Sequence, residues 1–144
     1  MTSSTGQNNK MLSLLAEQRR KIDEVSSKSL LANSEKIHMY KLLISYIEQH
    51  HDNYEIYTPS TLRQATHCKN DKELYEVISF FSGGYSNLFD VKYCYYQDAE
   101  QLDIRKDEFI NFIENRIEPV DKNGMDIDDF DPENLSFYCV ISHE

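Results

Sequence analysis

The sequence predicts a mixed α+β fold built as one domain. Several segments repeat apolar residues at spacings of three and four, the pattern of helices with one buried face. Two segments, residues 88–97 and 135–142, are instead rich in aromatic and β-branched residues, which is typical of strands. A chain of 144 residues fits a single domain and is long enough to bury a core without metals or disulfides.

The N-terminal segment predicts a disordered tail followed by a helical arm. Residues 1–9 are small and polar, as the loose ends of domains often are. Residues 10–32 carry an apolar stripe near one helical face, and we expect this stripe to contact a partner or a second copy of the chain. Its members are Met11, Leu15, Ile22 and Val25. Two interpretations stay open: a core or docking helix, which is favoured, and a dimeric coiled coil, for which about two to three heptads are few.

Residues 33–144 predict the α+β domain itself, which begins with two helices. The first is capped by Asn33 or Ser34 and has apolar residues on one face. A short extended segment at residues 54–57 follows. The second helix is short and begins at the Thr-Pro-Ser sequence of residues 58–60, with Thr58 or Ser60 at its cap. Proline is tolerated there because it lies in a first helical turn.

The third helix of the domain is predicted at residues 70–82. Asn70 can cap it, with Glu73 as a partner three residues later. The Ser-Gly-Gly sequence at residues 82–84 predicts its end, since glycine readily takes the left-handed conformation after a helix.

The rest of the chain predicts two strands with an insertion between them. The strand at residues 88–97 is followed by a helix at 105–117, with Phe109, Phe112, Ile113 and Ile117 inward. Turn residues and charge then predict an acidic loop at residues 118–134. We expect the strand at 135–142 to pair with the first strand in a small antiparallel sheet.

This order of elements resembles a winged helix-turn-helix domain over about residues 35–141. The segments that carry the resemblance are EKIHMYKLLISYIEQHH, EIYTPSTLRQATH, NDKELYEVISFFSGG, LFDVKYCYYQ and LSFYCVIS. The resemblance implies that helix 70–82 is the recognition helix and that the wing contains residues 118–133. Acidic residues offset Lys69 and Lys72 on that helix, and the wing is acidic where a DNA reader carries Lys or Arg. The sequence therefore looks more like winged helices that dock proteins.

The distribution of charge also argues against simple DNA binding. The net charge is -10, but residues 1–72 carry a net of +2 and residues 73–144 a net of -12. Affinity for nucleic acid comes mostly from neutralising phosphates, and phosphates repel the acidic half. We therefore expect no direct nucleic-acid binding, although a DNA-binding regulator that uses residues 58–82 remains an alternative.

The acidic stretch at residues 118–133 predicts a contact for a basic partner. It has a net charge of -6, and apolar residues are interleaved with the acids. Acids steer an encounter and buried apolar residues hold the complex. The expected contact residues are Asp126, Asp128, Asp129, Phe130 and Asp131. An equally favoured interpretation is that Ile127 and Phe130 pack into the chain's own core while the acids keep it soluble.

The remaining patterns predict no catalytic, cofactor or metal site. An EF-hand loop needs glycine at its sixth position, but loops counted from Asp121 or Asp126 place aspartate there. The pairs at residues 50–51 and 67–68 do not have the spacing of a zinc site. We expect that the chain is not an enzyme.

Together these patterns predict a non-catalytic interaction subunit or adaptor of an intracellular multiprotein complex. The sequence begins without an apolar signal core, has no apolar run of about 18 residues, and has three cysteines without a CxxC pair. The expected partner is a protein with a basic surface, and residues 10–32 are the expected site of any oligomerisation. The alternative in a different class is an acidic inhibitor that occupies the basic surface of a nucleic-acid-acting protein.

Overall fold

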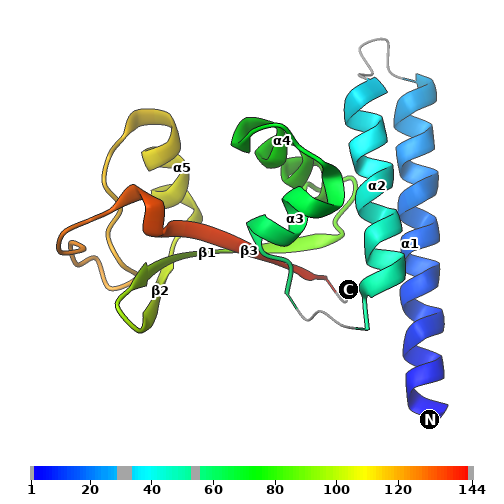
Figure 1. The fold of residues 1–144 in the computed structure, drawn as a ribbon, viewed down its shortest axis with the longest axis horizontal. Coiled ribbons are helices and arrows are strands. Elements are labelled where there is room, and N and C mark those ends of the chain that lie inside the picture. Colours follow the sequence, from blue (N-terminus) through cyan, green and yellow to red (C-terminus); the bar gives the residue numbers. More distant parts are fainter. Residues whose placement is uncertain (1, 29–33, 53–55, 143–144) are drawn as a thin grey trace.

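The chain has an α+β fold in a computed structural model that describes residues 2–28, 34–52 and 56–142, with side chains described from residue 10 on. The elements are α1 (Thr2–Lys28), α2 (Ser34–His50), α3 (Pro59–Thr66), α4 (Asp71–Ser82), β1 (Phe89–Gln97), β2 (Glu100–Ile104), α5 (Lys106–Asn115), a 3-10 turn (Pro132–Asn134) and β3 (Leu135–Ile141). They form two lobes (Figure 1). The helical lobe contains α1 to α4, the distal lobe contains β2, α5 and the acidic loop, and β1 and β3 run through both.

Helix α1 packs along α2 and belongs to the helical lobe (Figure 1). Leu15 and Ile22 are fully buried in the chain's own core, and Met11 and Val25 are partly buried against it. The N-terminal helix is confirmed, but the prediction that Leu15 and Ile22 face a partner is wrong. The reason is that α2 offers an apolar face to the stripe, so the chain covers the stripe itself.

The helix also begins earlier than predicted. Residues 2–9, predicted as a disordered tail, belong to α1, because extending an existing helix adds a hydrogen bond for each residue fixed and no proline interrupts this segment. The end of the predicted arm, residues 29–32, lies outside the described residues, as do Asn33 and residues 54–55 of the predicted extended segment.

Polar contacts hold α1 in place from both sides. The guanidinium of Arg19 donates to both carboxylate oxygens of Glu48 in α2, at 3.0 and 2.7 Å, and this hydrogen bonding lowers the pKa of Glu48. On the other side, the buried amide of Gln18 donates to the carbonyl oxygen of Ser86 at 2.9 Å. The Ser86 hydroxyl donates back to the Gln18 side-chain oxygen at 2.6 Å. Helix α1 is therefore tied to the loop between α4 and β1.

The predicted caps of α3 and α4 are confirmed, with Thr58 and not Ser60 capping α3. Thr58 accepts from the amide of Thr61 before α3, and Asn70 accepts from the amide of Glu73 before α4. Helix α4 ends at Ser82 as predicted, but the expected reason is wrong: Gly83 has φ -73°, which is not left-handed. A Cβ at Gly83 would lie 3.1 Å from the carbonyl oxygen of Ser79, so close packing, not a positive φ, explains the glycine.

The sheet has the strand order β2-β1-β3, and both pairings are antiparallel. The predicted pairing of the two long strands is confirmed, with Tyr93 opposite Phe137. Strand β2 was not predicted, although Leu102 and Ile104 alternate with polar residues after a two-residue turn. Ahead of α3, Tyr57 forms an isolated bridge to Cys139 on the outer edge of β3.

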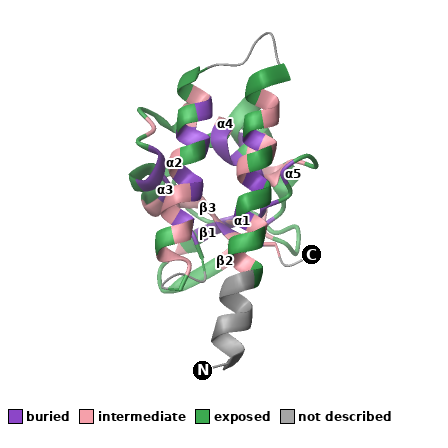
Figure 2. Ribbon diagram, turned by 90° about the vertical axis from the view of Figure 1, so that its right-hand side faces the viewer, coloured by how far each residue is buried: buried purple, intermediate pink, exposed green. Residues whose placement is uncertain are grey.

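Each lobe has its own apolar core. The larger core joins α1 to α4 with one end of β1 and β3, and Figure 2 shows its buried residues on α1, α2 and the strands behind them. The smaller core contains Tyr95, Ile104, Phe109 and Ile127. Strands β1 and β3 run through both cores. Helices α4 and α5 stand on the same side of the sheet, facing each other (Figure 1).

Candidate functional site

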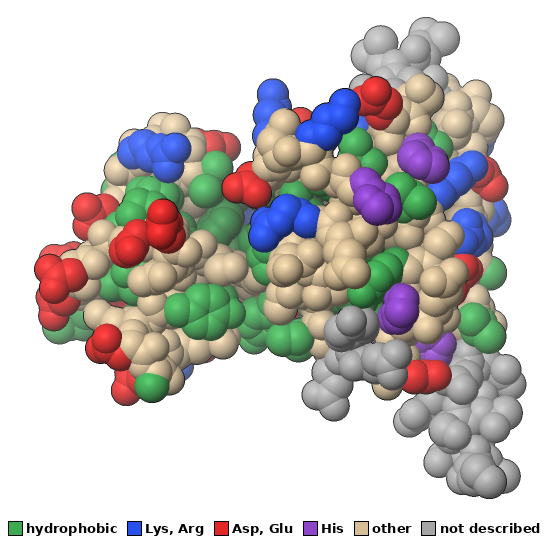
Figure 3. Space-filling model, in the orientation of Figure 1, with side chains coloured by type: hydrophobic (Ala, Val, Ile, Leu, Met, Phe, Trp, Pro, Cys, Tyr) green, Lys and Arg blue, Asp and Glu red, His purple; other side chains and the backbone are tan. Residues whose placement is uncertain are grey.

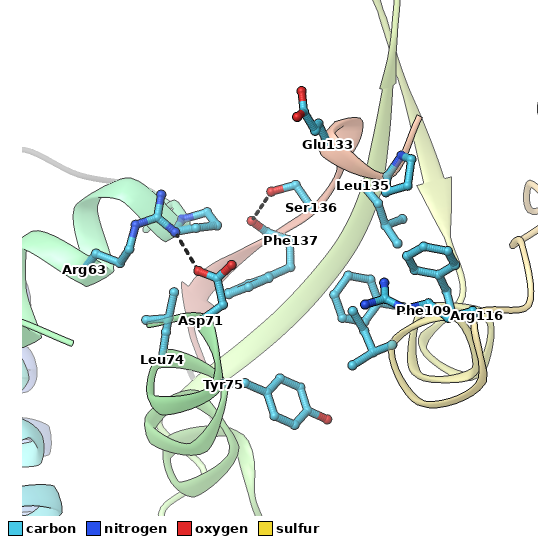
Figure 4. A pocket seen from close by; sticks show the side chains of 14 residues that line it. Arg63, Asp71, Leu74, Tyr75, Phe109, Arg116, Glu133, Leu135, Ser136 and Phe137 are labelled. Atoms are coloured by element: carbon cyan, nitrogen blue, oxygen red, sulfur yellow. Dashed lines mark hydrogen bonds and ion pairs between the residues drawn. The ribbon is translucent and has the colours of Figure 1, made fainter. Parts of the chain in front are cut away.

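A groove of about 490 Å³ lies between α4 and α5, over the first residues of β3. Leu74 lines it from α4 and Phe109 from α5, with Phe137 of β3 between them (Figure 4). Both helices are placed by the sheet: α4 packs on one end of β1 and α5 on the other. The groove is therefore the apolar space that the two lobes leave above their shared strands.

Two large apolar side chains in this groove are open to solvent. Tyr75 of α4 is 39% exposed and Ile113 of α5 is 48% exposed, and Figure 4 shows Tyr75 directed toward the α5 side. The helix was predicted to extend to residue 117 with Ile113 and Ile117 inward, but α5 ends at Asn115, and Ile117 lies beyond it and is 56% exposed. Ile113, within α5, lies outside the core beneath the helix and adds to the groove.

The charged residues that line the groove are balanced. Arg63 of α3 lies 3.5 Å from Asp71, and both are exposed. Arg116, just after α5, lies over the ring of Phe112 at 5.2 Å from its centroid, and Glu133 lies at the distal end. The groove itself is therefore near neutral, with an apolar interior and a mixed rim.

The distal lobe around the groove is strongly acidic. Residues 93–135 carry 13 Asp and Glu against 4 Lys and Arg, a net of -9. Figure 3 shows carboxylates over this lobe, whereas most Lys, Arg and His side chains on the same face lie over the helical lobe. A positively charged ligand would therefore be drawn toward the distal end of the groove.

The acidic loop is ordered by its own polar contacts. The carboxylate of Asp121 accepts from the amides of Asn123 at 2.9 Å and Met125 at 3.0 Å. The side chains predicted to attract a partner, Asp126, Asp128, Asp129 and Asp131, are all exposed. These carboxylates are therefore available to an approaching cation.

Phe130, in contrast, belongs to the fold. Its ring stacks on Tyr95 and meets Phe112 edge-on, each at 5.2 Å between centroids, and Ile127 beside it is buried. The amide of Asp131 also donates to the hydroxyl of Tyr95 at 2.8 Å. The prediction of Phe130 as a partner anchor is wrong, because β1 and α5 present aromatic rings that the loop covers. The other interpretation, a loop packed on the chain's own core, is confirmed for Phe130 and Ile127.

The structure does not bring the two predicted contact regions together. The stripe on α1 lies in the helical lobe, and the acidic loop lies at the far end of the distal lobe (Figure 1). The groove between them was not predicted. Its residues come from helices far apart in the sequence, and the only local signal was the unusual width of the apolar stripe that includes Ile113.

The cysteine next to His67 is not arranged as a nucleophile. The Cys68 sulfur lies 2.8 Å from the Thr66 hydroxyl, and burial raises the pKa of the thiol. His67 is exposed, with a left-handed backbone at the end of α3. Cys68 therefore fits a packing role beside Met39, whose sulfur is 3.7 Å away.

The function of this chain is inferred from its own surface, because comparison with known protein families, curated proteins and solved structures finds no match to it. Across the described ranges, no three His, Cys, Asp or Glu side chains gather as they would around a metal ion. No helix in the same part of the chain is long and apolar enough to cross a membrane. What points to a function is the groove, together with the charge of the lobe beside it.

Proposed function

We propose that this chain is a non-catalytic interaction subunit of an intracellular complex, and that it binds a basic segment of its protein partner in the groove between α4 and α5. The observation that carries the proposal is an open apolar groove next to a lobe of net charge -9. Protein interfaces combine an apolar centre with a polar rim, and aromatic residues such as Tyr75 are enriched in the centre.

The arrangement of elements supports the winged-helix interpretation as part of this proposal. Helices α2, α3 and α4 precede the β1–β3 pair, and Tyr57 bridges to β3 where the first strand of such a domain belongs. Helix α4 then takes the place of the recognition helix, but it faces α5 across the groove. The acids of the distal lobe stand beside it, which favours a protein ligand over DNA.

An acidic inhibitor is the second candidate. The observation that favours it is the set of four exposed aspartates at positions 126, 128, 129 and 131 on one loop. Such an inhibitor would depend on these carboxylates and not on the groove. The two candidates therefore respond differently to the variants below.

The groove is tested by a matched pair of isoleucine variants. The probe is a peptide selected on the purified chain from a random display library. Ile113→Ser is expected to weaken its binding about tenfold, because burying one such side chain is worth about 1.5–3 kcal/mol. Ile117→Ser is the control, since Ile117 is similarly exposed but does not line the groove. Equal affinities for the two variants in a fluorescence-anisotropy titration would contradict the groove.

The acidic loop is tested by a variant in which the aspartates at positions 126, 128, 129 and 131 are all changed to asparagine. Association of the selected peptide is expected to slow about tenfold at low salt, and its salt dependence is expected to flatten, because steering acts mainly on the on-rate. The dissociation rate, followed by stopped-flow, is expected to change less than about twofold. A faster dissociation with an unchanged association rate would mean that the loop holds the ligand, as in the inhibitor alternative.

A further inference from the structure

The outer edge of β3 is only partly covered. Tyr57 donates its amide to the carbonyl oxygen of Cys139 at 2.8 Å and accepts the Cys139 amide at 2.9 Å. The backbone groups of Cys139 therefore point away from β1. In an antiparallel strand the direction of these groups repeats every second residue, so the N–H and C=O of Phe137 point to the same outer edge.

A proline ends the coverage at this point. In the antiparallel register set by Tyr57 and Cys139, residue 59 would come opposite Phe137. Residue 59 is Pro59, which has no N–H to donate and begins α3, so the chain leaves the edge. Within the described residues, no backbone hydrogen bond from outside the sheet reaches the Phe137 N–H. The Leu135 N–H donates to the carbonyl oxygen of Pro132, and the Phe137 carbonyl oxygen accepts from the Ser136 hydroxyl at 3.5 Å, so the Phe137 N–H is the donor that this edge offers.

The uncovered edge opens into the groove. Pro59 and Arg63 line the groove together with Leu135 and Phe137, so the space extends from the start of α3 to the first residues of β3. Leu135 and Phe137 also share a face of the sheet, because side chains alternate along a strand. A strand placed on this edge would direct every second side chain toward the space between Tyr75 and Ile113.

We propose that the partner segment binds as an added β-strand along Leu135–Phe137, with apolar residues in the groove and Lys or Arg at its distal end. The proposal rests on the proposed function above. Main-chain hydrogen bonds to an open edge supply affinity, and pockets for alternate side chains supply specificity. The basic end follows from the charge beside the edge, where Glu133 and the exposed Asp131 precede β3.

The charge of the chain also argues for a different protein as the occupant. A second copy would bring the same overall charge of -10 and the same distal lobe of net charge -9 to the interface. Like charges at close range oppose such pairing. The occupant is therefore an extended basic segment of another protein.

Two short peptides with equal charge test this binding mode on the full chain. One alternates lysine and valine, which favours a strand, and the other contains lysine, alanine and leucine, which favour a helix. In NMR titrations the alternating peptide is expected to bind at least about tenfold more tightly and to slow exchange of the Phe137 amide at least about tenfold. N-methylation of one alternate set of its amides is expected to abolish binding, whereas methylation of the other set is not, because only one edge of a strand faces its neighbour.

Other results would overturn the proposal in distinguishable ways. Tighter binding of the helical peptide, with unchanged exchange at Phe137, would reject the added strand but keep the groove as a protein site. Resonance shifts confined to residues 126–131 would reject the added strand in favour of adsorption to the acidic loop. No binding of either peptide would reject the added strand, and it would reject the proposed function too if the display-selected peptide also failed to bind. Slowed exchange at Phe137 that depends on protein concentration alone would identify a second copy as the occupant.

Discussion

Leu15→Ala is expected to lower the free energy of unfolding by about 2–5 kcal/mol, the range for a fully buried leucine. Leu15 has no exposed surface, and its helix is held against α2 and the loop at Ser86. Truncation leaves a cavity that these fixed neighbours fill only in part. Urea unfolding followed by circular dichroism measures the change.

A leucine three positions earlier provides the control. Leu12 lies on the same helix but is 48% exposed, so Leu12→Ala is expected to change the free energy of unfolding by less than about 0.5 kcal/mol. Small and equal effects of both variants would mean that α1 does not belong to the core of the free chain. The helix would then be the partner-binding arm that its sequence first suggested.

Phe130→Ala is expected to destabilise the distal lobe by about 3 kcal/mol, the lower end of the range for a truncated phenylalanine, because Phe130 is only partly buried. The ring lies between Tyr95 and Phe112, and aromatic pairs of this kind add about 0.5–1.5 kcal/mol to the burial itself. Because the lobes have separate cores, hydrogen exchange of the β2 and α5 amides is the measurement that follows this lobe.

The matched control is in the same loop. Met125 is 64% exposed, so Met125→Ala is expected to leave the exchange of these amides within about 0.5 kcal/mol of the unsubstituted chain. If Phe130→Ala left exchange unchanged but sped dissociation of a bound peptide, Phe130 would be an interface anchor after all.

Most of the elements could be predicted because their signals are local. The 3–4 spacing of apolar residues, the caps at Thr58 and Asn70, and the aromatic strands each depend on neighbours in the sequence. Strand β2 was missed because five residues of alternating character form a weak pattern, even next to a turn.

What covers an apolar face could not be predicted in the same way. The stripe on α1 indicates a contact but not whether α2 or another protein makes it, and the sequence around Phe130 leaves the same choice. Ile113 shows the reverse case, since its helical spacing predicts burial and the structure exposes it. The groove depends on how far apart the shared strands hold α4 and α5, which no local pattern encodes.

The most direct test of the groove as the binding site is paramagnetic broadening by a bound peptide. A nitroxide is attached to the display-selected peptide, and amide signals of the full chain are compared with the label oxidised and reduced. The account predicts that broadening centres on Tyr75, Ile113 and Phe137, which line the groove from α4, α5 and β3. Broadening centred on the outer faces of α1 and α2, with these three amides unaffected, would contradict it.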